Sequence, residues 1–173
     1  MTIKNIVIIL LLLFAFISCK NNSDKRTERS GPGKNEMVEL NRYFVQKDRE
    51  RIINFIERKN LKMKESPTGL WYQIIKNGEG DTFTDNNKVI FDFECSLLDG
   101  TKCYSSKELG VKEVVLGKSQ MEAGLNEGLR MLNHGAEAVF IIPPFLAYGL
   151  IGDGKKIPSR AIIVYNVNIL RSK

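Results

Sequence analysis

Residue types that commonly carry catalysis are scarce in this chain. Its one histidine, His134, lies between Asn133 and Gly135 in a predicted helix-ending turn, where a capping or solvent role is expected. A single histidine excludes most zinc sites and most Ser-His-Asp designs. The sequence also has no glycine-rich phosphate loop between a strand and a helix, and no GxSxG motif. We therefore expect an activity that needs no metal and no cofactor.

The segment FIIPPFLAYGLIGDGKKIP, residues 140–158, is the most distinctive in the chain. Proline cannot donate a hydrogen bond within a sheet, so Pro143 and Pro144 should end the strand before them. The glycines that follow should let a loop turn back towards Ile157. Tyr148 is either a core tyrosine bonded to backbone or a pocket residue, and its Ala-Tyr-Gly context favours the pocket.

Overall composition indicates one globular domain with appendages. The chain has 173 residues and a formal net charge of +6. Its charges are scattered and do not form a basic stripe with aromatic residues, so nucleic-acid binding is not expected.

Residues 1–18 are predicted to be a signal peptide, because the apolar run after Lys4 is too short to span a membrane. The run ends in Phe16-Ile17-Ser18-Cys19, which resembles the lipobox of bacterial lipoproteins. The resemblance implies a palmitate-bearing lipid anchor on Cys19 and a place in the cell envelope, facing the periplasm or the outside. A plain secretory signal with a chance cysteine is the alternative. Residues 19–36 are polar and predict a flexible tether.

Apolar residues recur at three- and four-residue spacing from Met37 to Lys62. This spacing predicts an amphipathic helix, or two helices broken near Gln46, within a helical segment at 37–65. The helix either docks on its own domain, which the short apolar stripe favours, or forms a dimer or partner interface.

Residues 66–173 have the pattern of an α+β domain. Alternating segments predict strands in 69–80, 88–106, 111–117, 136–142 and 161–170, with an Asp99-Gly100 hairpin turn. One short helix is expected at 123–135, so the sheet should wrap across it. Cys95 and Cys103 flank the hairpin; a disulfide fits the geometry, but two buried thiols are the favoured interpretation.

The chain from about Ser66 to Leu170 resembles an FKBP-type peptidyl-prolyl cis-trans isomerase domain. The resemblance is carried by GLWYQIIKNGEG, LLDGTKCYSS, VVLGKSQMEAGLNEGLRML, GAEAVFIIPPFLAYGLIGDGKKIP and AIIVYNVNIL, in that order. It implies an FKBP-like antiparallel sheet around one short helix, prolyl isomerisation without a cofactor, and proline-containing polypeptides as partners. With its lipobox and the helix before GLWY, the chain also resembles the FKBP-type lipoproteins linked to gliding motility in Bacteroidetes.

The resemblance assigns pocket roles to several residues. Tyr148 matches the tyrosine whose hydroxyl binds a substrate carbonyl, and Ile157 matches the isoleucine at the pocket lip. Glu122 stands where the family has isoleucine, and its backbone N–H is the group that the family uses. Phe93 stands where the family has a tyrosine, and Tyr165 stands where it has a phenylalanine. Both changes keep the wall of the pocket aromatic. Met121 matches an aliphatic pocket residue.

Other pocket positions depart from the family pattern. Leu125 replaces the tryptophan of the pocket floor, Cys103 replaces a phenylalanine and Tyr104 replaces an aspartate. Lys112 falls near another usual aromatic residue. A buried aromatic side chain covers about 150–250 Å², so these losses predict reduced isomerase activity. The sequence thus predicts an envelope-anchored isomerase that assists the folding of secreted or surface proteins. The alternative is a catalytically weak FKBP-like chaperone or structural module of a motility or secretion assembly.

Overall fold

The computed structural model describes residues 33–170. Of the described residues, 39–170 belong to one compact unit and 33–38 to another. The predicted signal peptide and Cys19 lie outside the described residues, as does most of the predicted tether. Helix α2 (Lys34–Lys59) begins before the predicted end of the tether at residue 36 and ends before Lys62.

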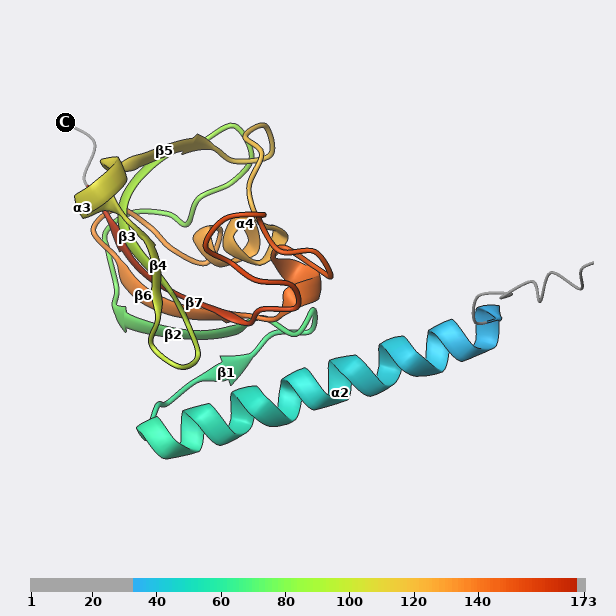
Figure 1. Cartoon of the computed structure of the whole chain (residues 1–173). Coiled ribbons are helices and arrows are strands. Elements are labelled where there is room, and N and C mark those ends of the chain that lie inside the picture. The colour runs from blue at the N-terminus through green and yellow to red at the C-terminus, as the bar shows by residue number, and fades with distance from the viewer. Residues whose placement is uncertain (1–32, 171–173) are drawn as a thin grey trace, which may run out of the picture. The chain divides into compact units, whose positions relative to one another are not determined.

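An antiparallel sheet forms the body of the larger unit, as predicted (Figure 1). The strand order is β1-β2-β6-β7-β3-β4, and β5 also pairs with β3. The strands are β1 (Lys64–Glu65), β2 (Trp71–Lys76), β3 (Lys88–Leu97), β4 (Lys102–Ser105), β5 (Lys112–Val115), β6 (Glu137–Ile142) and β7 (Ile163–Ile169). The predicted strand segments are thus confirmed, whereas the short strand β1 and helix α3 (Ser106–Leu109) were not predicted.

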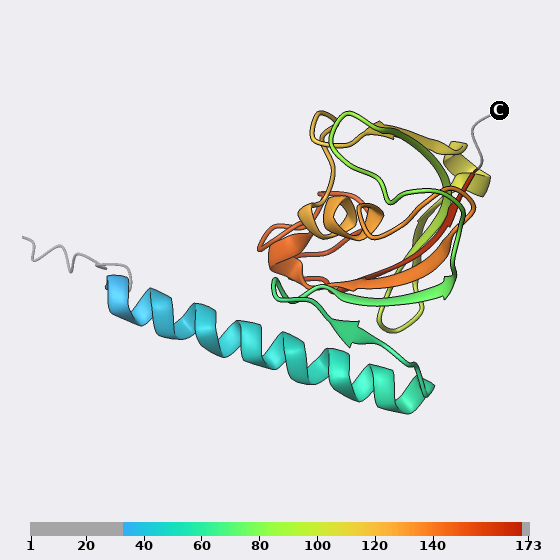
Figure 2. The ribbon, with the colours of Figure 1, turned by 180° about the vertical axis from the view of Figure 1, so that it is seen from behind.

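The curved sheet encloses α4 (Ala123–Leu129) on its inner side (Figures 1 and 2). Leu125 and Leu129 are buried there against the inward-facing side chains of β3 and β6. Gly128 has no room for a side chain, because an added Cβ would lie 2.7 Å from the ring of Phe140. Glycine at this position therefore lets the helix approach the sheet closely.

The opposite face of the sheet packs against the second half of α2. Ile52 is 1% exposed and lies in a cluster with Ile141, Ile162 and Val164. This cluster explains why β7 is buried on both faces near its start, where simple alternation predicts polar residues. The docked interpretation of the helix is confirmed for this half, and the alternative of two helices broken near Gln46 is wrong.

An ion pair ties α2 to the loop after Pro158. Asp48 is 4% exposed, and one of its oxygens accepts a hydrogen bond from Arg160 at 2.9 Å. The Arg160 guanidinium also lies over the Phe44 ring, 3.5 Å from its centroid. Arg160 has a backbone φ of +55°, a left-handed conformation that is uncommon for arginine. The loop conformation is therefore linked to the helix through this side chain.

Strand β6 ends at Ile142, immediately before the proline pair, and the chain then turns through a short 3-10 helix, η1 (Pro144–Leu146). This confirms the predicted strand end. Cys95 and Cys103 are buried free thiols, so the favoured interpretation is also confirmed. Burial raises the pKa of the Cys95 thiol to about 12, which keeps it protonated. None of the helices within residues 33–170 has the length and apolar character needed to cross a membrane.

Candidate functional site

A cleft of about 380 Å³ opens between β4, the α3–β5 segment and the loop that follows η1. Four of the residues predicted for the pocket line it: Phe93, Tyr104, Tyr148 and Tyr165. Four of its ten lining residues are therefore aromatic, which agrees with the aromatic wall that the resemblance implied. Residues 33–170 contain no group of three or more His, Cys, Asp or Glu residues placed to hold a metal ion.

Strand register brings the aromatic residues of the cleft together. Cys95 of β3 lies opposite both Tyr165 of β7 and Tyr104 of β4. Phe93, two residues earlier on β3, points to the same face, and its ring centroid is 5.9 Å from that of Tyr165. These positions are fixed by the sheet, whereas Tyr148 comes from the loop after η1.

Glu122 is the unexpected residue of this site. It precedes α4, and its side chain is only 4% exposed. Its Oε1 accepts hydrogen bonds from the hydroxyls of Tyr148 and Tyr165, the latter at 3.0 Å. Its Oε2 lies 3.9 Å from Lys112 Nζ. The sequence assigned Glu122 a role through its backbone N–H, but in the structure its carboxylate holds both pocket tyrosines.

This arrangement determines the state of the two tyrosine hydroxyls. Burial and the neighbouring Glu122 carboxylate raise the pKa of Tyr148 and of Tyr165, so both phenols stay protonated. A hydroxyl has only one proton to donate. The Tyr148 proton is therefore directed at Glu122, whereas the resemblance assigned it to a substrate carbonyl.

Asp153 organises the loop on the other side of the cleft. Its Oδ1 accepts hydrogen bonds from the backbone N–H groups of Lys155 and Ile157, both at 2.8 Å. Its Oδ2 accepts the Tyr104 hydroxyl. Burial disfavours the charged carboxylate, but these three hydrogen bonds together outweigh burial and lower the pKa of Asp153.

The other predicted pocket residues do not line the cleft. Leu125, Cys103 and Ile157 are at most 2% exposed and belong to the hydrophobic core. Leu125 lies on the side of α4 that packs into the core, and the Ile157 N–H donates to Asp153. Met121 is half-buried and packs against the same core. The predicted pocket roles of these four residues are therefore not seen at the surface of the cleft.

Several lining residues were missing from the predicted site. They are Leu109, Gly110, Val111, Asp153 and Lys155, whereas Lys112, which the resemblance placed near a usual pocket aromatic residue, does line the cleft. An Asp-Gly turn signal at Asp153 was present in the sequence, but the pairing of its carboxylate with Tyr104 joins positions 49 residues apart. The α3–β5 segment carried no motif that predicted its place at the cleft.

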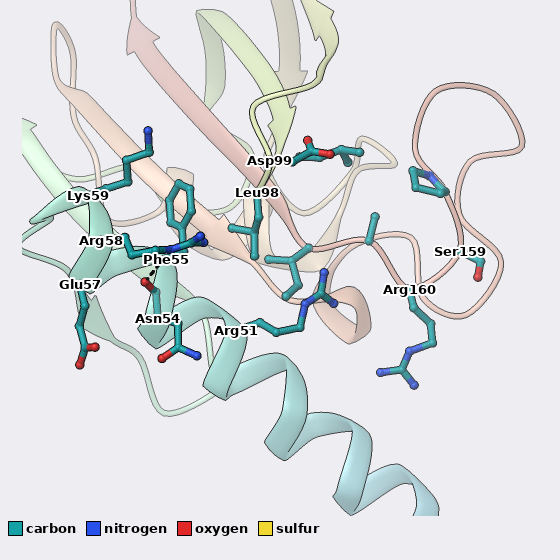
Figure 3. Close-up of a pocket in the computed structure, with 14 residues that line it drawn as sticks. Arg51, Asn54, Phe55, Glu57, Arg58, Lys59, Leu98, Asp99, Ser159 and Arg160 are labelled. Carbon is teal, nitrogen blue, oxygen red and sulfur yellow. Dashed lines mark hydrogen bonds between the residues drawn. The ribbon is translucent and has the colours of Figure 1, made fainter.

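A larger cleft, of about 1140 Å³, lies between α2, the β3–β4 turn and the loop at 158–162 (Figure 3). Arg51, Arg58 and Lys59 line it from the helix, with Phe55 and Leu98 between them and Arg160 on the loop. None of the predicted site residues lines this cleft. Two of its cations, Arg51 and Arg160, already pair with Asp48 of the fold. The aromatic cleft, which holds predicted site residues, is therefore the better candidate site.

Comparison with known proteins agrees with the aromatic cleft. A family model described as FKBP-type peptidyl-prolyl cis-trans isomerase matches residues 80–170, which include every residue that lines it. This chain belongs to that family. The match covers the strands from β3 to β7 and the helix α4, so the FKBP assignment rests on these elements.

Two curated relatives of this FKBP-family chain carry similar names. A probable FKBP-type peptidyl-prolyl cis-trans isomerase FkpA of Neisseria meningitidis serogroup B is 39% identical over 109 residues, which are 63% of this chain and 40% of that protein. FkpA of Escherichia coli K12 is 32% identical over 111 residues, 64% of this chain and 40% of that protein. The chain thus matches less than half the length of these relatives.

Solved structures share the FKBP fold. The N-terminal domain of FKBP42 from Arabidopsis thaliana matches with a TM-score of 0.59 and 25% identity, covering 63% of this chain and 90% of that one. The crystal structure of FkpA from Escherichia coli matches with a TM-score of 0.60 and 22% identity, covering 99% of this chain and 83% of that one. These likenesses confirm the predicted fold class.

Proposed function

We propose that this chain is a peptidyl-prolyl cis-trans isomerase that binds proline-containing polypeptide segments in the aromatic cleft. The observation that carries the proposal is the cleft itself, which holds Phe93, Tyr148 and Tyr165 together within the part matched by the family model. An aromatic-lined hollow with a few polar groups suits a proline ring and its flanking amides.

Such a site needs no nucleophile, metal or cofactor. Rotation about an X-Pro amide faces a barrier of roughly 18–20 kcal/mol, which arises from amide resonance. The aromatic wall would remove water from the amide, and resonance is lost more readily in an apolar environment. Hydrogen bonds that favour the twisted amide over either planar form then lower the barrier. Tyr148 is the cleft residue to which we assign such a hydrogen bond.

A second candidate function is a non-catalytic module that grips apolar or proline-containing segments. Two observations favour it: the Tyr148 hydroxyl donates to Glu122, and Leu125 and Cys103 are buried in the core. Leu150 and Ile151, next to Tyr148, are 64% and 85% exposed and would provide an apolar contact. We place isomerisation first because the aromatic wall is intact.

The cellular setting is also a proposal. The lipobox-like Phe16-Cys19 segment supports anchorage of the chain to the cell envelope through Cys19. There it would assist the folding of secreted or surface proteins, whose proline-limited steps are slow. A part in gliding motility rests on the resemblance to the Bacteroidetes lipoproteins.

A refolding assay tests the enzymatic proposal. The chain from residue 19 onward, with Cys19→Ser, is added to a model protein whose slow refolding phase is limited by proline isomerisation. We expect this phase to accelerate, and we expect Tyr148→Phe to slow the accelerated phase by several-fold. An unchanged slow phase in both cases would favour the non-catalytic module.

A further inference from the structure

The buried carboxylate of Glu122 accepts a hydrogen bond from the Tyr148 hydroxyl, the group that the proposed reaction needs for its substrate. Glu122 Oε1 accepts the Tyr148 hydroxyl, and it also accepts the Tyr165 hydroxyl at 3.0 Å. Glu122 Oε2 lies 3.9 Å from Lys112 Nζ, and the Glu122 side chain is 4% exposed. Because so little of the carboxylate is exposed, water has little access to replace these partners.

Three residues of this cluster differ from what the FKBP resemblance leads us to expect, and two of them, Tyr165 and Lys112, lie against the third, Glu122. Glu122 stands where the family has an isoleucine, Tyr165 stands where it has a phenylalanine, and Lys112 falls near a usual aromatic residue. A carboxylate placed alone among the usual apolar residues would be buried without partners, which costs several kcal/mol in general. With the two hydroxyls and the lysine around it, the charge is compensated. Tyr148, Tyr165 and Lys112 thus surround the Glu122 carboxylate as one unit.

We propose that Glu122 is a positioning residue that withholds the Tyr148 hydroxyl from the empty pocket. A proline-containing substrate must then break the Tyr148–Glu122 hydrogen bond before Tyr148 donates to it. Tyr165 orients the carboxylate and Lys112 balances its charge. This inference rests on the proposed isomerase function. It identifies the Tyr148–Glu122 hydrogen bond as the interaction that limits the rate of isomerisation.

A purely structural carboxylate would behave differently. If Glu122 only stabilised the start of α4, its removal would lower stability and leave catalysis unchanged or weaker. If it withholds Tyr148, its removal makes a folded enzyme faster. Measuring the catalytic rate and the free energy of unfolding therefore distinguishes a purely structural Glu122 from one that withholds Tyr148.

The test uses the full chain, purified in detergent, and a short Xaa-Pro peptide as substrate. The main variant is Glu122→Ile with Tyr165→Phe, because Glu122→Ile alone would leave the buried Tyr165 hydroxyl without an acceptor. We expect kcat/KM to rise roughly tenfold, since a hydrogen bond to a charged acceptor is worth about that factor or more. Adding Tyr148→Phe should cancel the gain. Glu113→Gln, an equal charge change at an exposed position of β5, should have no effect.

A second measurement does not depend on catalysis. Tyrosine labelled with carbon-13 at Cζ reports each phenol by NMR, and Tyr148→Phe identifies the signal of Tyr148. In the unaltered chain we expect a Tyr148 hydroxyl proton that exchanges slowly with water. In the double variant this exchange should become fast. Fast exchange in the unaltered chain would overturn the proposal.

The outcomes are distinct from those of the proposed function. A folded double variant that is no faster than an active unaltered chain overturns the role of Glu122. If both chains are inactive, the proposed function fails, and hydroxyl exchange of Tyr148 tests the role of Glu122 by itself. The activity of the unaltered chain decides the proposed function by itself. If the double variant fails to unfold cooperatively, Glu122→Gln replaces it, because glutamine keeps an uncharged acceptor and should give a smaller gain that Tyr148→Phe again cancels.

Discussion

At the scale of single residues, Asp153 lines the cleft and also stabilises the fold through its hydrogen bonds. One of its oxygens accepts two backbone N–H groups of its own loop, and the other accepts the Tyr104 hydroxyl. Asp153→Ala leaves these donors without their acceptor. We expect the free energy of unfolding at pH 7 to fall by about 1–3 kcal/mol, measured by urea unfolding.

The effect of Asp153→Ala should depend on pH in a defined direction. The folded structure lowers the pKa of Asp153 below its unfolded value of about 3.9. The stabilisation is therefore complete above that value and is lost as the pH falls through the lower folded pKa. The difference between variant and unaltered chain should shrink below about pH 4. Asp81→Ala, at an exposed position, is the control, and a difference that is independent of pH would contradict this account.

The residues of the candidate site differ in how far the sequence predicted them. Phe93, Tyr104, Tyr148 and Tyr165 were assigned to the pocket by the family resemblance, and they line the cleft. Strand register brings the first two and Tyr165 together, and the loop after η1 adds Tyr148. The side-chain role of Glu122 was not predicted. Its hydrogen-bond partners are 26 and 43 residues further along the chain, and no local pattern encodes such a contact.

At the scale of elements, α2 has two halves with different surroundings. Ile52 is 1% exposed against the sheet, whereas Leu40, Tyr43 and Val45 are each more than 40% exposed. The amphipathic spacing of the sequence runs through both halves without distinguishing them. Periodicity shows which face of a helix is apolar, but it does not show where along the helix that face meets a partner.

Burial of Ile52 predicts that α2 stabilises the sheet. Ile52→Ala should lower the free energy of unfolding by about 2–4 kcal/mol, because it leaves a cavity against Ile141 and Val164. Leu40→Ala, on the exposed half, should change it by less than about 0.5 kcal/mol. Urea unfolding of the two variants measures both values. Equal effects would show that the helix does not dock as described.

At the scale of the whole molecule, the exposed apolar residues of α2 leave the alternative of a dimer interface open to test. We propose that the Leu40 and Val45 region contacts a second copy of the chain. The mass in solution should then be that of a dimer for the unaltered chain and of a monomer for Leu40→Glu with Val45→Glu. Lys64→Glu, on exposed β1, controls for the added negative charge. A monomeric mass for the unaltered chain would remove the proposal.

The proposed lipid anchor would hold the FKBP-family domain at a membrane surface. Its attachment depends on the sulfur atom of Cys19. If Cys19 carries the lipid, cells that express the full chain with labelled palmitate should yield a labelled protein in the membrane fraction. Cys19→Ala should lose the label and leave the membrane fraction, because no other membrane attachment is proposed. Cys103→Ala, which removes a buried thiol of the folded unit, should keep the label. Label that persists in Cys19→Ala would contradict the lipoprotein proposal without affecting the isomerase proposal, since the cleft lies wholly within residues 93–165.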